Sequence, residues 1–480
     1  MNKIRQLINN KLPDGSFIRN VVTLMTGTTF AQALLILIAP ILTRLYSPDD
    51  FGIFALYTSI LGILAVVACF RYELAIVLPE KDEDAANVLA LSILITLGLS
   101  FIILLLVAVF KNSFSNLLGA PELSFWLWFM PFSLLVAGLF QIFNYWSTRK
   151  KQFRRLAVRQ ITQSSVTAVT QLSAGAITSG AGGLIGGHIA GQAVATGRLA
   201  GQIWKDEGKQ ILSYLSKEKI KKVLLRYKDF PLFSSWAIFL NSISAALPAL
   251  LLAYFFNPII VGYYALGHRV LAMPLGVIGG AVAQVFFPRA TEAYNKGELD
   301  SLTISIFGEL VSIGLVPLLL LMLVAPDLFV IVFGDSWLVA GEYVRWLSLW
   351  LFLQFISSPI SMIYMILERQ REFLRFNFIL FIIRFLSLMV GGILESPLLA
   401  IALYGITGAL LYSVFCFNIL NMAKVDIVKA GLIILRQAIY SIPFLIIPIL
   451  MYNAFNNSLI FVISAVIMGG VFLFYKGGKL

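Results

Sequence analysis

The chain has 480 residues, of which 59% are hydrophobic and only 12% charged, and its formal net charge is +12. Soluble domains hold roughly 45–50% apolar and about 25% charged residues, so this composition excludes an ordinary water-soluble fold. The positive charge needs no nucleic-acid partner if the basic residues gather in loops on one side of a membrane, which is the pattern found below.

Fourteen apolar segments along the chain predict membrane-spanning helices, each of roughly 20 residues. Six lie near residues 21–43, 51–77, 87–110, 124–147, 156–178 and 182–203. Six more lie near 231–254, 258–287, 304–333, 341–367, 373–393 and 397–420, and a last pair lies near 432–452 and 458–475. The sequence therefore predicts an all-α polytopic membrane protein. We divide it into an N-terminal six-helix lobe (1–203), a basic cytoplasmic linker (204–230), a C-terminal six-helix lobe (231–420) and an extra two-helix pair (421–480).

The Lys and Arg residues alternate between the two sides of this predicted bundle. With the N-terminus placed in the cytoplasm, 31 of the 36 basic residues lie in the inside segments or in the inner halves of the adjoining spans, and the outside segments hold only Arg44 and Lys111. Cytoplasmic loops of membrane proteins carry such an excess of positive charge. We therefore expect both termini in the cytoplasm, contact of the inside loops with anionic membrane lipids, and no nucleic-acid partner.

An internal repeat relates the two halves of the chain. Four residues of the first half recur in the second half at a constant offset of 210, namely Pro48, Gly52, Ala55 and Leu56, which match Pro258, Gly262, Ala265 and Leu266. Chance matching between apolar segments is the alternative explanation. With an even number of helices in each half, the repeat indicates two parallel lobes about an axis along the membrane normal, as in some secondary transporters.

Three short segments resemble a known family. The segment APILTRLYSPDDFGIFAL (Ala39 to Leu56) resembles the start of Wzx-type polysaccharide flippases of the multidrug/oligosaccharidyl-lipid/polysaccharide (MOP) transporter superfamily. FRYELAIVLP (Phe70 to Pro79) and VGYYALGHRVLAMP (Val261 to Pro274) also resemble it. The resemblance implies two lobes around a central cavity. It also implies transfer of undecaprenyl-diphosphate-linked oligosaccharide units to the outer leaflet of a bacterial inner membrane, for O-antigen, capsule or exopolysaccharide, with a polysaccharide polymerase as a further partner.

Four ionisable residues at membrane depth are candidates for substrate binding, because such residues are costly and usually face a cavity. Arg269, next to His268, lies about eleven residues into its predicted span, hence about 16 Å deep. Arg71 and Arg384 lie within other spans. Guanidinium groups offer fork-shaped donors that match a diphosphate. As alternatives, Arg71 pairs with Glu73 or reaches the headgroups, and Arg384 braces an interhelical hydrogen bond.

The sequence predicts no catalytic residue, no metal site and no cofactor. The two cysteines, Cys69 and Cys416, lie in apolar runs, and no phosphate-binding loop of an ATPase occurs. Transport would then depend on the membrane potential or on a coupling ion. H⁺ or Na⁺ are the candidates, with His268 as a proton-linked switch and Glu309 as a cation site.

Other functions stay open at this point. A drug/cation antiporter or a peptidoglycan-precursor flippase would share the superfamily, but organic cations need buried carboxylates, and the deep charges here are mainly basic. A membrane glycosyltransferase using Asp49 and Asp50 is disfavoured because the outer loops are short. Candidates for sugar recognition are Asn144, Tyr145, Trp146, Asn241 and Gln354.

Overall fold

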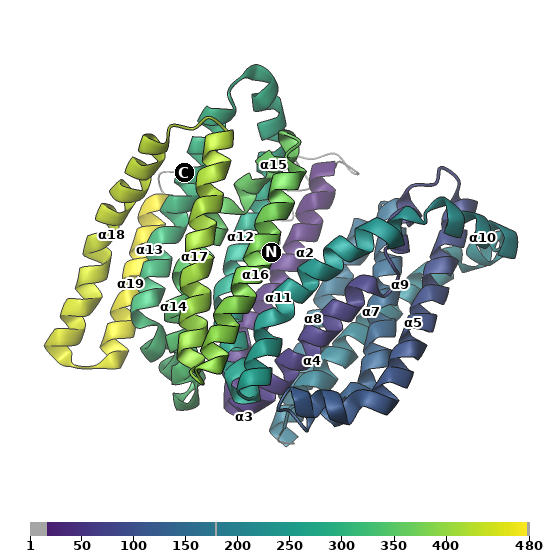
Figure 1. Ribbon diagram of the computed structural model, residues 1–480, viewed down its shortest axis with the longest axis horizontal. Helices are drawn as coiled ribbons and strands as arrows, with labels where there is room; N and C mark the ends of the chain where they lie inside the picture. The colour runs from purple at the N-terminus through teal and green to yellow at the C-terminus, as the bar shows by residue number, and fades with distance from the viewer. Residues whose placement is uncertain (1–16, 178–179, 478–480) are drawn as a thin grey trace. The chain divides into compact units, whose positions relative to one another are not determined.

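The computed structural model describes residues 17–177 and 180–477, and these residues form helices joined by short turns (Figure 1). Up to residue 258 the elements are α2 (Phe17–Leu37), α3 (Ala39–Leu45), α4 (Pro48–Val67), η1 (Tyr72–Val77), α5 (Asp82–Leu117), α6 (Leu123–Trp126), η2 (Leu127–Phe129), α7 (Met130–Arg149), α8 (Phe153–Ile177), α9 (Gly182–Tyr214), α10 (Lys217–Arg226), η3 (Phe230–Ser234) and α11 (Ser235–Phe255). The chain ends, predicted to be cytoplasmic, fall outside the described residues.

The remaining elements begin at Pro258. They are α12 (Pro258–Lys296), α13 (Leu299–Phe333), η4 (Asp335–Trp337), α14 (Leu338–Ser357), η5 (Pro359–Met362), α15 (Ile363–Ile366), α16 (Gln370–Ile393), α17 (Pro397–Met422), α18 (Ile427–Phe455) and α19 (Ser458–Gly477). Each of the fourteen predicted segments contains helix, and the described residues form no strand, so the all-α polytopic prediction is confirmed.

The number of helices that can cross a membrane is smaller than fourteen by length and apolarity alone. Among the described residues eleven helices satisfy both conditions, and a twelfth arises if the pair Asp335–Ser357 and Pro359–Ile366, bent by 40°, is one broken span. The two predicted segments that fail are α8 and α9. They are long helices, but polar residues such as Gln160, Thr162 and Gln163 run along α8. Fourteen is therefore an approximate count.

The second predicted span, 51–77, is shorter than expected, because α4 ends at Val67. Phe70 and Arg71 follow with positive φ angles of 45° and 64°, and η1 begins at Tyr72. No glycine or proline marks this break in the sequence. At the far end of η1, Arg149 of α7 donates to the carbonyl oxygens of Ile76 and Pro79 at 3.2 and 2.5 Å, and so provides partners for carbonyl groups where the helix ends.

The chain divides into two compact units, Met1–Pro258 (unit 1) and Ile259–Leu480 (unit 2). In unit 1, α2 packs on α8 and α11 packs on α4. Between α8 and α9 glycines let the two backbones approach closely. A Cβ at Gly191 would lie 2.0 Å from Thr167 Oγ1, and one at Gly187 would lie 2.4 Å from Gln171 Cγ. The predicted lobe boundaries at 203 and 231 stay predictions.

The predicted linker, 204–230, is largely helical and is attached to the start of α5. The side-chain amide of Asn87 donates to the Tyr214 carbonyl oxygen at 2.9 Å, and its oxygen accepts from the Ser216 backbone N–H at 3.0 Å. Lys219 forms an ion pair with Glu83. The end of α9 and the start of α10 are thus fixed to α5.

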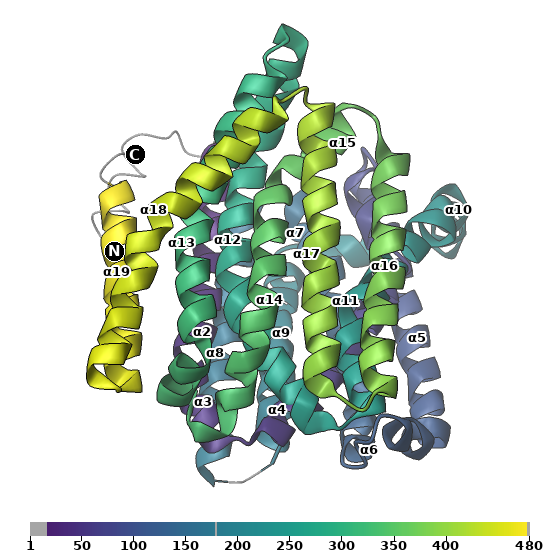
Figure 2. The same ribbon diagram turned by 60° about the vertical axis from the view of Figure 1, so that its left-hand side comes forward.

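In unit 2 the C-terminal helix pair packs on α13 (Figure 2). Apolar residues from both sides form a buried cluster, which consists of Val316, Leu320 and Val324 from α13 and Phe461, Val462, Ala465 and Phe472 from α19. Lys476 lies 3.5 Å from Glu309 in an ion pair. The pair α18 and α19 is therefore part of unit 2.

Candidate functional site

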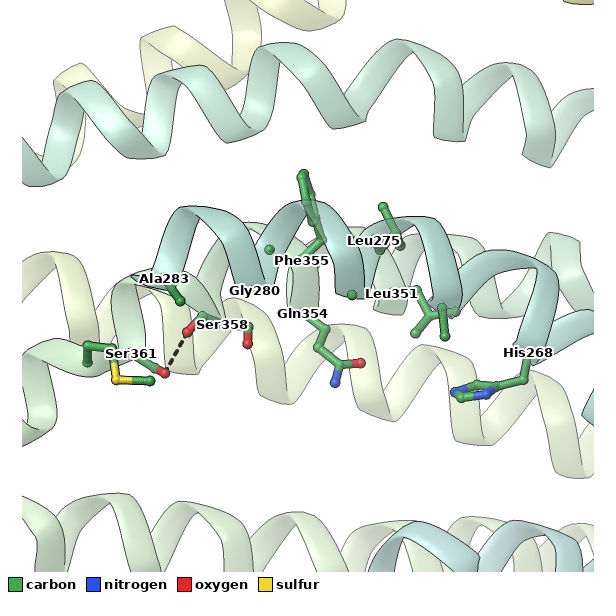
Figure 3. A pocket seen from close by; sticks show the side chains of 13 residues that line it. His268, Leu275, Gly280, Ala283, Leu351, Gln354, Phe355, Ser358 and Ser361 are labelled. Atoms are coloured by element: carbon green, nitrogen blue, oxygen red, sulfur yellow. Dashed lines mark hydrogen bonds between the residues drawn. The ribbon is translucent and has the colours of Figure 1, made fainter. Parts of the chain in front are cut away.

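A cavity of about 340 Å³ lies in unit 2 between α12, α14 and η5 (Figure 3). His268 is at one end and Ser361 at the other, with Gln354 between them. Glycine and apolar residues form most of the remaining wall, namely Ala272, Leu275, Gly276, Gly279, Gly280, Ala283, Leu351, Phe355 and Met362, together with Ser358. The glycines on α12 leave room that larger side chains would fill. The cavity thus combines an apolar wall with a few polar side chains.

His268 is held among aromatic rings at its end of the cavity. Its ring stacks on Tyr264 with a centroid distance of 5.5 Å and on Trp350 with a centroid distance of 6.0 Å. Trp350 in turn contacts Tyr404 edge-on at 4.9 Å. These rings come from α12, α14 and α17, so the position of the imidazole is fixed by three helices.

Arg384 of α16 joins the same aromatic cluster. Its guanidinium carbon lies 5.2 Å from the ring centroid of Trp350 and 5.7 Å from that of Tyr404, both within cation–π range. It also interacts with the hydroxyl of Tyr412. Its Nε is buried without a hydrogen-bond partner, and in the described part of the chain it forms no ion pair with a carboxylate. Arg384 is thus a cation held by aromatic rings.

The structure therefore brings together two of the four predicted substrate-binding residues, His268 and Arg384. Arg269 follows His268 on α12, but adjacent residues on a helix point about 100° apart, and neither Arg269 nor Arg384 is among the residues that line the cavity. Arg71 lies in unit 1 at the start of η1, and its Nη1 is 3.4 Å from Oε1 of Glu73, a fully buried carboxylate. Arg71 thus has a carboxylate partner, unlike Arg384.

Arg159 of α8 is a further candidate, which the sequence interpretation counted among the inside basic residues and did not consider as a site residue. Its side chain is only 7% exposed, and its guanidinium carbon lies 3.3 Å from the ring centroid of Phe140 on α7. Its Nε has no hydrogen-bond partner, and the same holds for the buried oxygens of Gln192 and Thr196 on α9. The polar stretch that follows Arg159 in α8 was the available signal that this helix is not simply lipid-exposed.

Other sequence candidates have different surroundings. Gln354 lines the cavity of unit 2. Trp146 is 1% exposed and donates to Glu207 at 3.2 Å, so its indole is part of the packing between α7 and α9. Asp50 closes a capping box with Ser47 at the start of α4. This capping role stabilises the helix terminus and assigns no chemistry to Asp50.

Comparison with known proteins gives the family of the chain. The family model described as polysaccharide biosynthesis protein matches residues 41–342. A relative is the succinoglycan biosynthesis transport protein ExoT of Rhizobium meliloti (strain 1021), 23% identical over 342 residues, which are 69% of this chain and 65% of that protein. Another is an uncharacterized membrane protein in the cps region of Klebsiella pneumoniae, 24% identical over 265 residues. The latter match covers 53% of each chain. This chain thus spans between half and two thirds of those relatives.

Solved structures share the fold. The lipid II flippase MurJ in an inward closed conformation superposes with a TM-score of 0.70, at 14% sequence identity, over 96% of this chain and 100% of that one. An inward-facing multidrug resistance MATE family transporter of the MOP superfamily superposes with a TM-score of 0.60 at 17% identity, over 81% of this chain and 95% of that one. The chain is a multi-pass membrane protein of the polysaccharide biosynthesis protein family with the fold of the MOP superfamily, as its resemblance to Wzx-type flippases implies.

Proposed function

We propose that this protein is a flippase that moves undecaprenyl-diphosphate-linked oligosaccharide units from the inner to the outer leaflet of a bacterial inner membrane by alternating access. The units would serve the synthesis of a surface polysaccharide, with a polysaccharide polymerase using them on the far side. The observation that carries the proposal is the position of Arg384 and His268 around Trp350 beside the cavity of unit 2.

The charge at this position supports an anionic substrate. A cation held by aromatic rings, with no carboxylate to neutralise it, is available for a phosphate, which accepts hydrogen bonds from guanidinium N–H groups. The buried Nε of Arg384 is such an unused donor. An exporter of organic cations would need a carboxylate here, and the described cavity wall has none. We therefore prefer the polysaccharide branch to the drug/cation antiporters.

The cavity itself suits the sugar part of the substrate. Gln354, Ser358, Ser361 and His268 offer polar groups along one side of an otherwise apolar or glycine-lined space. Pockets for small molecules commonly show this combination of apolar wall and few polar groups, at volumes of about 300–1,000 Å³. At about 340 Å³ the cavity has room for one or two sugar rings and not for the whole lipid-linked unit.

The remaining cationic candidates take subsidiary roles in this proposal. Arg159 is the best anion contact of unit 1, because it is buried and lacks a carboxylate partner. Arg269 stays a candidate from its depth in α12. Arg71 would contact substrate only if its ion pair with Glu73 opened. In the absence of an ATPase motif, outward movement of the anionic headgroup gains about 2.3 kcal/mol per charge from a membrane potential of 100 mV.

The test measures leaflet exposure of a fluorescent undecaprenyl-diphosphate oligosaccharide in vesicles that contain the purified protein. We expect Arg384→Ala to lower protein-dependent transfer at least tenfold. Arg375→Ala, an exposed arginine on the same helix, is the matched control and should transfer normally. Arg269→Ala tests the neighbouring candidate in the same assay.

Each outcome decides one part of the proposal. Normal transfer by Arg384→Ala would support the flippase function but contradict a role for Arg384 in substrate binding. No transfer by the unmodified protein, together with efflux of organic cations from the same vesicles, would assign it to the drug-exporting branch. Transfer that is unchanged when the membrane potential is collapsed would exclude the field as the driving force.

A further inference from the structure

Unit 1 contains a second cavity, which the proposed transport mechanism does not use. It has a volume of about 370 Å³ and lies between α5, α7 and α9. Every residue that lines it is apolar or glycine: Leu89, Ile93, Phe143, Ala200, Gly201, Ile203, Trp204 and Ile211. The indole N–H of Trp204 is the one side-chain hydrogen-bond donor among these lining residues, and so apolar a wall suits a hydrocarbon and not a sugar or a phosphate.

The cavity lies close to the basic end of unit 1. Leu89 is seven residues after the start of α5 at Asp82, and Phe143 is six residues before the end of α7 at Arg149. At 1.5 Å per residue these separations are about 9–11 Å, which is less than the thickness of one leaflet's hydrocarbon, about 15 Å. The cavity is thus at the depth where the upper part of a lipid chain lies.

Two lysines lie where the headgroup of such a lipid would be. Lys205 and Lys209 follow Gly201 at four-residue intervals, so they lie on the same face of α9 as this cavity residue. Both are exposed, and within the described residues neither forms an ion pair with a carboxylate. By contrast, Lys150 nearby is already paired with Asp82 and Glu207.

The other end of the cavity continues onto an exposed apolar surface. Ile93, Leu97 and Phe101 follow one another at four-residue intervals along α5, and the last two are 47% and 60% exposed. Exposed large apolar side chains on a membrane-spanning helix face lipid hydrocarbon. Trp204, which is 61% exposed, lines the cavity from α9 at the depth of Lys205. A chain that enters the cavity therefore has an apolar path along α5.

We propose that this cavity binds one acyl chain of an anionic phospholipid, whose phosphate contacts Lys205 and Lys209. A phospholipid is the favoured occupant because the cavity opens onto the surface that contacts the bilayer, where phospholipid chains are the main component. The pair of unneutralised lysines selects anionic headgroups over zwitterionic ones. This lipid site involves only residues of unit 1. The proposal therefore holds whichever substrate the protein transports.

The test uses full-length protein in nanodiscs with phosphatidylglycerol that carries a photoreactive diazirine on one acyl chain. Peptides are mapped after illumination. We expect labelling of the α9 segment 200–211 and of the Leu89–Ile93 segment of α5. Gly201→Leu should fill the cavity and lower this labelling at least fivefold. Gly197→Leu is the matched control, because it is one turn away on α9 and a Cβ at either glycine meets nothing within 4 Å.

A second variant keeps the test decisive if the filled cavity disturbs folding. Lys205→Gln/Lys209→Gln changes only exposed side chains, and it should lower labelling by phosphatidylglycerol at least threefold while leaving labelling by phosphatidylcholine unchanged. Equal labelling by the two lipids in the unmodified protein would overturn the headgroup assignment. Retained labelling in Gly201→Leu would contradict binding of the acyl chain in this cavity. Preferential displacement of the label by undecaprenyl phosphate would assign the cavity to the carrier lipid instead of phospholipid.

Discussion

His268 and Arg384 meet at the same tryptophan. The imidazole centroid lies 6.0 Å from that of Trp350, and the Arg384 guanidinium carbon lies 5.2 Å from it. An imidazole and a guanidinium cation thus contact one aromatic side chain that is 2% exposed. Changes to Trp350 therefore affect both groups at once.

We expect Trp350→Phe to preserve folding but weaken substrate transfer. The indole Nε1 of Trp350 has no hydrogen-bond partner, so losing this N–H leaves no acceptor unsatisfied. The cation–π attraction on Arg384 falls, because phenylalanine is a poorer partner than tryptophan, and the difference is about 0.5–1 kcal/mol. Transfer should fall about threefold, and thermal unfolding should change by only a few degrees. Unchanged transfer in Trp350→Phe would show that the contact of this ring with Arg384 is not needed for transport.

Trp350→Ala, in contrast, should destabilise unit 2 by about 3–5 kcal/mol.

Arg159 should not be replaceable by lysine. The planar guanidinium lies 3.3 Å from the ring centroid of Phe140, and an ammonium cannot reproduce this stacked contact. We expect Arg159→Lys and Arg159→Gln to lower transfer to a similar extent, about tenfold, with normal protein levels in the membrane. Arg154→Gln, an exposed arginine one and a half turns earlier, is the control. Full activity of the lysine variant would indicate that only the charge at this position matters.

The contact between α8 and α9 should not tolerate a side chain at Gly191. A Cβ there would lie 2.0 Å from Thr167 Oγ1 and 2.7 Å from the carbonyl oxygen of Gln163, and the backbone atom cannot move away easily. We expect Gly191→Ala to destabilise unit 1 by about 1–3 kcal/mol. Gly197→Ala on the same helix meets nothing within 4 Å, so it should be neutral or stabilise by up to about 1 kcal/mol. Thermal unfolding in detergent compares the two variants. Equal stability would contradict the close packing.

Asn87 should hold the start of α10 against α5. It is fully buried and binds the Tyr214 carbonyl oxygen and the Ser216 N–H. Asn87→Ala leaves these backbone groups without a partner, at a cost of about 1–3 kcal/mol. We expect faster amide hydrogen exchange across residues 212–226 and little change in α7. Asn112→Ala, an exposed position on the same helix, should exchange like the unmodified protein. Unchanged exchange in Asn87→Ala would show that other contacts hold the segment.

Particular residues show how far the sequence could predict the fold and the site. Long apolar runs predict helices well, because a segment in lipid must satisfy its own backbone hydrogen bonds. The break after Val67 escaped prediction because Phe70 and Arg71 adopt left-handed conformations that their side chains do not signal. The depth of Arg384 and His268 marked them as candidates, but the aromatic rings that join them come from three separate helices, α12, α14 and α17. Such tertiary contacts have no local pattern.

Arg159 was missed for a different reason. It lies at the inner end of the predicted span 156–178 and was counted with the inside basic residues, which the positive-inside pattern places near the headgroups. In the structure α8 begins at Phe153, and the buried side chain of Arg159 packs on Phe140 of α7. A count of basic residues on each side of the membrane does not reveal such a contact between helices.

The hydrogen bonds and the ion pair of Arg149 connect three elements of unit 1, namely α7, η1 and α5. One guanidinium binds the carbonyl oxygens of Ile76, Pro79 and Glu80 and also the carboxylate of Asp82. A sliding of α7 along its axis would pull on all four acceptors together. We therefore expect the end of α7, η1 and the start of α5 to move together, with the left-handed residues Phe70 and Arg71 as the hinge between this group and α4.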